Sequence, residues 1–333
     1  MENVRDEAKL KEAIFQTVAF FDMFDYPLTI FEIWQYLRFK CDIADVQKIL
    51  DSRQDLRTEP SAIDKIDEKN GLYFLAGRSE IYETRLKRYN FSERKFRRLS
   101  RVARIFKLIP WIKMIAMGNM IGSDNLKDGS DIDLFIVTEK KRIWITRLFC
   151  VSIIKLLRLR PVPGKEKDKI CLSFFISEAD LDLRSLMLDK AAKPLRSADR
   201  SGLAAFDLDV YFIYWLIMLV PVYDTQGVYK KLMHENNWVH FFMPNWRPAE
   251  IVRRRQAGKP LPYIYKDIVD MLVGGLETNV KKWQLKIMPE VLARPLNKDT
   301  RVVANDNIIK LHANDRREEY REKFIKKVAN MTQ

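Results

Sequence analysis

The residues most able to do chemistry lie in one short segment, MGNMIGSDNLKDGSDIDLFIV, which spans residues 117–137. Asp131 and Asp133 alternate with apolar residues there, a pattern that predicts a strand running to Val137. Because residues i and i+2 of a strand point to the same face, the two carboxylates should lie side by side at one edge of a sheet. Like charges that close need a cation, and carboxylate oxygens suit Mg²⁺ held together with phosphates. The segment therefore predicts a magnesium site.

The same segment resembles the minimal nucleotidyltransferase motif of the DNA polymerase beta superfamily. In that motif an apolar residue, Gly, and Gly or Ser precede a spacer, which leads to Asp, an apolar residue, Asp or Glu, and a second apolar residue. Here Met117-Gly118-Asn119 is followed by an eleven-residue spacer and then Asp131-Ile132-Asp133-Leu134. The resemblance covers about residues 110–180. It implies that Asp131 and Asp133 are catalytic and bind Mg²⁺, and that the nucleotide contacts Gly118, Asn119, Gly129 and Ser130.

The resemblance also implies a reaction. An enzyme of this kind transfers a nucleoside monophosphate from an NTP, which we expect to be ATP, to a hydroxyl acceptor. The acceptor hydroxyl attacks the α-phosphate in line and pyrophosphate leaves. A small molecule, a protein side chain or an RNA 3′ end could serve as the acceptor, and the sequence does not choose between them.

The chain departs from the family pattern in two places. Asn119 stands where Ser or Gly is usual, although an Asn side chain can still donate to a phosphate oxygen. The strand expected at Lys169–Ile176 has no acidic residue, so the family's third carboxylate is missing, and Ser173, its central polar residue, should face the site. Three acids flank that strand: Asp168, Glu178 and Asp180. If none of them reaches the aspartates, the alternative is a degenerate nucleotidyltransferase that binds a nucleotide or nucleic acid without catalysis.

The N-terminal residues predict a second unit. A capping box at Thr29 and Glu32 and the hairpin signal Asn70-Gly71 mark its turns. Its expected elements are helices at about 7–21, 29–37 and 43–52 and strands at 62–67 and 72–76. Three helices followed by a hairpin are the order of a winged helix. The third helix and the hairpin are acidic, which favours a packing or docking module over a DNA-binding regulator, the remaining alternative.

Charge is distributed unevenly along the chain, whose net charge is +14. Residues 1–84 hold 11 Lys and Arg against 17 Asp and Glu, whereas residues 85–107 hold ten basic residues against Glu93 alone. We expect the basic segment to be a connecting helix opened by Ser92. Its apolar stripe should consist of Phe96, Leu99, Ala103 and Phe106. The remaining basic face is either solvated or a surface for RNA or another nucleic acid.

The rest of the chain predicts mostly helix. Arg142–Leu159 should form one helix, whose Arg142 and Arg147 are either solvated, which is the favoured interpretation, or in contact with a triphosphate. Asp207–Val222 should form a strongly apolar helix. His312 has no partner that the sequence identifies. Cys41, Cys150 and Cys171 are scattered, which argues against disulfides and zinc and is typical of a cytoplasmic protein.

The expected fold class is α+β. It combines a winged helix, a nucleotidyltransferase-type α/β core with a mixed sheet, and a helical C-terminal domain. The expected boundaries are 1–84 for the winged-helix-like domain, 85–110 for the basic helix, 111–185 for the core and 186–333 for the helical domain. The longest apolar run, Val210–Val222, is shorter than the roughly 20 residues that span a bilayer, so no membrane partner is expected.

Overall fold

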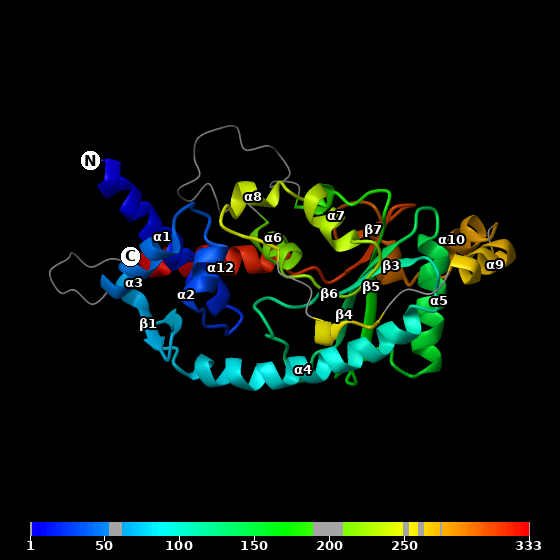
Figure 1. The fold of residues 1–333 in the computed structure, drawn as a ribbon, viewed down its shortest axis with the longest axis horizontal. Helices are drawn as coiled ribbons and strands as arrows, with labels where there is room; N and C mark the ends of the chain where they lie inside the picture. Colours follow the sequence, from blue (N-terminus) through cyan, green and yellow to red (C-terminus); the bar gives the residue numbers. More distant parts are fainter. Residues whose placement is uncertain are drawn as a thin grey trace.

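A six-stranded mixed sheet carries the candidate site in this computed structural model, and the fold is α+β (Figure 1). The structure describes residues 2–52, 62–188, 209–248, 253–258, 263–273 and 275–332. The strands, in sheet order, are β6 (Val220–Asp224), β3 (Ile112–Met117), β4 (Ile132–Thr138), β5 (Ile170–Ser177), β8 (Ile308–Leu311) and β7 (Val302–Ala304). β4 and β5 are parallel, and every other neighbouring pair is antiparallel. None of the helices among these residues is long and apolar enough to cross a membrane.

The N-terminal elements follow the predicted order. They are α1 (Glu2–Asp22), α2 (Ile30–Tyr36), α3 (Ile43–Ser52), a 3₁₀ turn at Ala62–Lys65, β1 (Ile66–Lys69) and β2 (Leu72–Leu75). The capping box is confirmed, since Glu32 N donates to Thr29 Oγ1 and Thr29 N donates to Glu32. The hairpin is confirmed as well, because Asn70 and Gly71 both have positive φ, as a type I′ turn requires. The first strand is shorter than predicted because its opening residues form the 3₁₀ turn.

The basic connecting helix is longer than predicted. α4 runs from Glu80 to Phe106 along one edge of the molecule, from the hairpin to the sheet (Figure 1). The expected apolar stripe is confirmed, since all four of its residues are buried. Ser92, predicted to open the helix, lies inside it and is buried; its hydroxyl accepts from Leu126 N. Because α4 begins at Glu80, twelve residues before Ser92, the Ser92 hydroxyl does not cap the helix. It binds instead the loop that leads to the aspartates.

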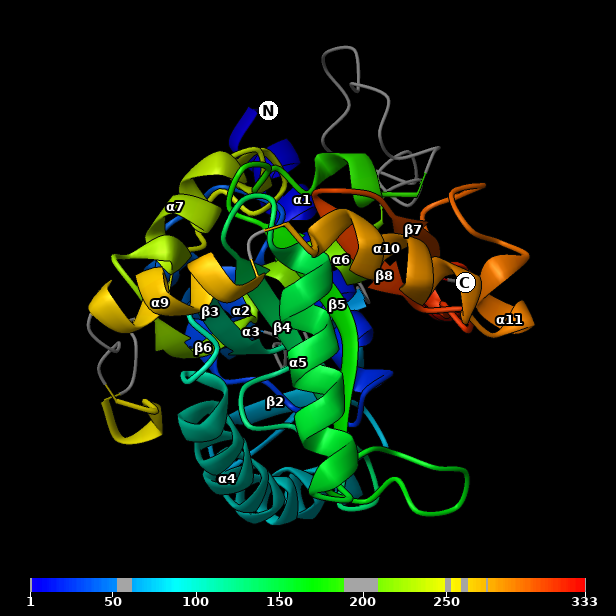
Figure 2. The same ribbon diagram turned by 90° about the vertical axis from the view of Figure 1, so that its right-hand side faces the viewer.

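The two faces of the sheet are covered by different helices (Figure 2). The covering helices are α4 and α5 (Ile143–Leu156), with α10 (Glu277–Lys286) against α5, on one face, and α6 (Val210–Ile217) and α12 (Arg317–Thr332) on the other. Alternation along β4 explains this arrangement. Leu134 and Ile136 join the apolar cluster of the α4 and α5 face, whereas Phe135 and Val137 join the cluster that contains α6 and α12. Asp133 shares the face of Phe135, so the candidate site opens toward α6 and α12.

Within 186–333, which was expected to be mainly helical, the described residues contribute three strands to the sheet, β6, β8 and β7. The helix predicted at 207–222 ends at Ile217, and Val220–Asp224 forms the edge strand β6; residues 207 and 208 lie outside the described residues. Pro221 explains the difference, because proline is tolerated on an edge strand but interrupts a helix. The remaining helices are η2 (Arg184–Leu186), α7 (Val228–Glu235), α8 (Val239–Phe242), η4 (Arg253–Arg255), α9 (Tyr263–Val273) and α11 (Glu290–Ala293).

Candidate metal and nucleotide site

Two carboxylates and one thiol converge at the start of β4. The ligand atoms of Asp131, Asp133 and Cys171 all lie within 4.8 Å of one another, and this is the one such cluster of His, Cys, Asp or Glu in the described part of the chain. The strand register explains it, since Cys171 of β5 is the direct partner of Asp133. The predicted pairing of the two aspartates is therefore present. A cysteine stands beside them where a third carboxylate was sought.

The cluster is electrostatically unfavourable without a cation. Burial and the negative charge of Asp131 raise the pKa of Asp133 to about 7. Burial also raises the pKa of Asp131, an effect that the nearby Lys95 ammonium opposes. Burial and the charge of Asp133 raise the pKa of the Cys171 thiol. A bound divalent cation would favour the ionised form of all three groups, which is the chemistry expected of a metal site.

The turn at Gly118 is tied directly to the aspartates. Gly118 N donates to the carbonyl oxygen of Asp133 at 2.9 Å, and Asn119 Nδ2 donates to the carbonyl oxygen of Asp131 at 3.0 Å. The buried Oδ1 of Asn119 has no hydrogen-bond partner among the described residues. The side chain of Asn119 thus orients the loop that carries Asp131 and leaves one polar atom available at the site.

The other two predicted nucleotide contacts lie on the approach to Asp131. Gly129 is exposed, and the Ser130 hydroxyl donates to the carbonyl oxygen of Lys127 at 3.0 Å. Neither residue lines the cavity that Asp133, Gly118 and Asn119 share.

Two of the three candidate third carboxylates lie at the wrong end of the sheet. β5 runs parallel to β4, and the amide of Glu178 donates to the carbonyl of Thr138 at the far end of β4. At about 3.3 Å per residue, Glu178 is roughly 20 Å along the strand from Cys171, and Asp180 lies beyond it.

The third candidate, Asp168, is neutralised by two cations of α4. Lys95 Nζ lies 2.9 Å from Asp168 Oδ1, and Arg94 Nε lies 3.0 Å from Oδ2. Although burial works in the opposite direction, hydrogen bonds from Lys95 and Arg94 hold the pKa of Asp168 below its usual value. Lys95 is fully buried and also donates to the carbonyl oxygen of Ser130. Asp168 and Lys95 thus form a support for the residues that precede Asp131.

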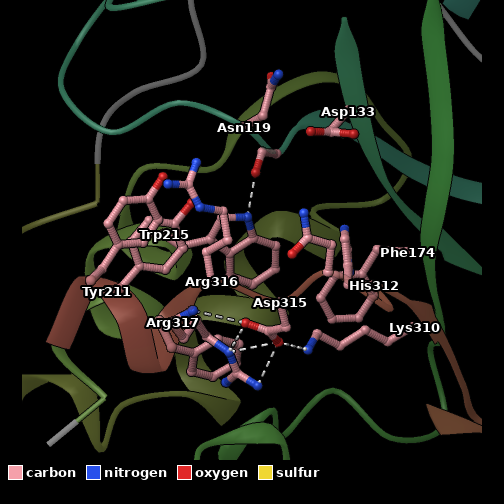
Figure 3. A pocket seen from close by; sticks show the side chains of 14 residues that line it. Asn119, Asp133, Phe174, Tyr211, Trp215, Lys310, His312, Asp315, Arg316 and Arg317 are labelled. Atoms are coloured by element: carbon pink, nitrogen blue, oxygen red, sulfur yellow. Dashed lines mark hydrogen bonds and ion pairs between the residues drawn. The ribbon is translucent and has the colours of Figure 1, made fainter. Parts of the chain in front are cut away.

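A cavity of about 190 Å³ opens beside Asp133 (Figure 3). Its walls combine aromatic rings and cations from β5, α6, β8, α12 and the connection between β8 and α12. They include Phe174, Tyr211, Trp215, Tyr320, Lys310, His312, Arg316 and Arg317. Trp215 stacks on Phe174 with centroids 5.2 Å apart and planes at 8°, and its indole N–H donates to the carbonyl oxygen of Gly118. An aromatic wall is thereby fixed to the Gly118 turn.

His312, which lines this cavity, forms a polar pair with Ser173. Ser173 Oγ lies 2.9 Å from His312 Nε2, so the histidine without a predicted partner has one. Ser173 is buried and also interacts with the Cys171 thiol, so it lies beside the cluster, although it does not line the cavity. Burial and the charge of Lys310 lower the pKa of His312 to about 4. The imidazole is therefore neutral near pH 7, and its buried Nδ1 has no partner among the described residues.

A buried ionic network forms the floor of the cavity. Asp315 pairs with Lys310 at 2.8 Å and with Arg317 at 2.9 Å, and Arg317 also reaches Asp209, the N-cap of α6, at 2.6 Å. Burial and the charge of Arg317 lower the pKa of Lys310 to about 8. The network joins β8, α12 and α6, three of the elements that line the cavity.

Sequence reasoning missed Cys171, Lys95 and the segment at 310–320. The sequence carries no signal for Cys171, because its place opposite Asp133 depends on the register between β4 and β5. The two arginines considered as triphosphate contacts lie away from the aspartates. Arg142 pairs with Asp270 at 3.0 Å, and Arg147 bonds Gln284, because α5 begins at the opposite end of β4 from the aspartates.

Comparison with known proteins gives no further assignment: no protein-family model matches this chain, and no curated protein matches it significantly.

Proposed function

We propose that this chain is a metal-dependent nucleotidyltransferase that transfers a nucleoside monophosphate from an NTP, expected to be ATP, to a hydroxyl acceptor. The observation that supports this most directly is the pair of carboxylates, Asp131 and Asp133, beside the Gly118 turn at the mouth of a cavity. The aromatic wall at Trp215 and Tyr211 offers flat apolar faces of the kind on which bases stack. RNA remains one possible acceptor, alongside a small molecule or a protein hydroxyl.

The donor set fits a divalent cation. Asp131 and Asp133 would hold Mg²⁺ through carboxylate oxygens, and Cys171 would supply a third, softer donor. When bound, the ion would withdraw charge from the phosphate oxygens. The protein's own contribution is orientation. Asn119 and Lys95 hold the segment of Asp131 in place through backbone carbonyls.

One observation favours a second function. No third carboxylate joins Asp131 and Asp133 within the described ranges, and Cys171 stands in that place. A site of this composition suits a degenerate nucleotidyltransferase that binds a nucleotide and does not turn it over. The two functions share the cavity and differ in whether pyrophosphate is released.

Transfer of label from α-labelled NTPs tests the proposal, with Mg²⁺ and cell extract as the source of acceptor. Asp133→Asn should reduce both label transfer and pyrophosphate release by about a hundredfold or more, because several kcal/mol of transition-state stabilisation are lost. Asp267→Asn is the matched control, because Asp267 is an exposed carboxylate on α9 that forms no hydrogen bond or ion pair with the described residues. NTP binding without pyrophosphate release in the wild type would identify the binding module, and equal transfer by Asp133→Asn would overturn both functions.

A further inference from the structure

A second cavity lies on the opposite face of the sheet, between α5 and α10. Its volume is about 220 Å³. Leu311 of β8 lines it, whereas the neighbouring residues Lys310 and His312 line the cavity beside Asp133. Successive residues of a strand point to opposite faces, so the sheet separates the two cavities. A ligand here would be distinct from the nucleotide.

Three cations line this second cavity, and no carboxylate of the described residues does. They are Arg147 and Lys155 of α5 and Arg160, four residues beyond the end of α5. No ion pair among the described residues involves any of them; Glu290, next in sequence to a lining residue, is bound to Arg294 at 2.7 Å. The charges of Arg147, Lys155 and Arg160 are therefore not neutralised by an ion pair with any described residue.

A hydrogen bond to Gln284 orients the Arg147 guanidinium at this cavity. One of its terminal nitrogens donates to Gln284 Oε1, and its buried Nε has no hydrogen-bond partner among the described residues. Burial and the like charge of Arg160 lower the pKa of Arg147 to about 10. An anion placed between the two guanidinium groups would remove this repulsion.

The lining of this cavity is also apolar and partly open to solvent. Leu148 and Val151 of α5 line it together with Trp283 of α10 and Ile287, the residue that follows α10, and Trp283 and Ile287 are 49% and 56% exposed. These apolar residues share the cavity with cations that form no ion pair among the described residues. A ligand that combines an anionic group with hydrocarbon would suit this lining.

We propose that this cavity binds a small phosphate monoester that carries a short apolar chain. Three unpaired cations favour a dianionic phosphate over a carboxylate, and arginine presents its donors in a fork that matches phosphate oxygens. The volume is below the about 300–1,000 Å³ of pockets for drug-sized ligands, so the chain is short. This inference does not depend on the proposed nucleotidyl transfer.

Calorimetric titration of the full chain with hexyl phosphate tests the proposal, with inorganic phosphate and 1-hexanol as the two half-ligands. Hexyl phosphate should bind one to one and more tightly than either half. Arg147→Met, which keeps the packing of the stem, and Arg160→Gln, at an exposed position, should each weaken binding about tenfold. Ile287→Asn should weaken hexyl phosphate binding about threefold to tenfold and leave inorganic phosphate unaffected.

Matched controls lie on α10 and α11, at positions that do not line the cavity. Lys282→Gln and Val291→Asn change an exposed cation and an exposed apolar residue that do not line the cavity, and both should bind hexyl phosphate as the wild type does. The proposal fails if 1-hexanol binds as tightly as hexyl phosphate, if inorganic phosphate does, or if Arg147→Met and Arg160→Gln both bind it unchanged. Equal weakening by Lys282→Gln would also overturn it, because the effect would then be one of net charge alone.

Discussion

At the scale of single residues, the position of Cys171 decides what kind of metal site the aspartates can form. Asp131 and Asp133 could be paired from the sequence, because a two-residue spacing on one strand needs no knowledge of the rest of the fold. Cys171 could not, because its place opposite Asp133 depends on the register between two strands that are separated by a helix. Ser173, the residue expected nearest the aspartates, lies two residues beyond Cys171, where the register between β4 and β5 shifts, and bonds His312.

The first residue-scale prediction concerns this thiol. Cys171→Asp should raise the affinity of the protein for Mg²⁺ by on the order of tenfold, because a hard carboxylate replaces a soft donor that Mg²⁺ does not favour. Calorimetric titration with MgCl₂ measures the change. Cys171→Ser is the control, since it removes the thiol at nearly constant size and should not raise the affinity. An unchanged Mg²⁺ affinity in a folded Cys171→Asp variant would show that residue 171 does not contact the ion.

The second residue-scale prediction concerns His312 and acid stability. Its pKa is about 4 in the folded protein and about 6.5 when exposed, so as the pH falls through this range the unfolded chain takes up a proton that the folded chain does not. The free energy of unfolding should therefore decrease from pH 6.5 to pH 4, by about 2.5 kcal/mol for this group. His312→Gln, which can still bond Ser173, should show a correspondingly smaller decrease. Denaturant unfolding at several pH values measures it, and parallel curves for the two proteins would contradict the prediction.

At the scale of elements, the sequence predicted correctly the features that depend on contacts between residues close in sequence. The capping box of α2, the hairpin at Asn70-Gly71 and the apolar stripe of α4 all depend on residues close in sequence, and each was predicted. The ends of α4 and α6 were not, since Ser92 and Pro221 take part in contacts with distant segments.

Several basic residues of α4 form ion pairs within the protein, which the net charge of the segment did not predict. Arg85 binds Glu32 and Arg88 binds Asp25, which fastens the helix to the N-terminal elements. Arg94 and Lys95 bind Asp168 near the candidate site. The nucleic-acid surface predicted for this helix is therefore limited to its exposed cations, such as Arg97, Arg101 and Arg104.

The element-scale prediction tests this support. Lys95→Met should lower the free energy of unfolding by about 3 kcal/mol, because the Asp168 carboxylate and the Ser130 carbonyl lose their buried donor. Metal affinity should fall as well, since Asp131 follows Ser130 directly. The double variant Lys95→Met/Asp168→Asn should recover part of the stability. Denaturant unfolding provides the measurement, and Arg97→Met on the exposed face of α4 is the matched control. Additive effects of the two substitutions would contradict the coupling.

At the scale of the whole molecule, the N-terminal elements and the C-terminal helix share one apolar cluster. Phe20 of α1 lies 4.5 Å from Tyr214 of α6 and 5.5 Å from Phe324 of α12 between ring centroids. Gly122, in the loop before the aspartates, packs so closely on Tyr26 that an added Cβ would lie 2.7 Å from the ring. Sequence boundaries at 84 and 110 describe changes in charge and pattern, and they say nothing of contacts such as these between distant segments.

The last prediction follows from this shared cluster. A fragment comprising residues 85–333 should not fold cooperatively when expressed alone, because Tyr214 and Phe324 lose the apolar partners supplied by α1. Arg85 and Arg88 would also lose their carboxylate partners. Co-expression with residues 1–84 should restore a complex that copurifies and unfolds in one transition, as measured by circular dichroism during thermal denaturation. If residues 85–333 alone unfolded cooperatively at the wild-type temperature, the N-terminal elements would be an independent domain; the burial of Phe20 between α6 and α12 leads us to expect instead that the two parts fold as one unit.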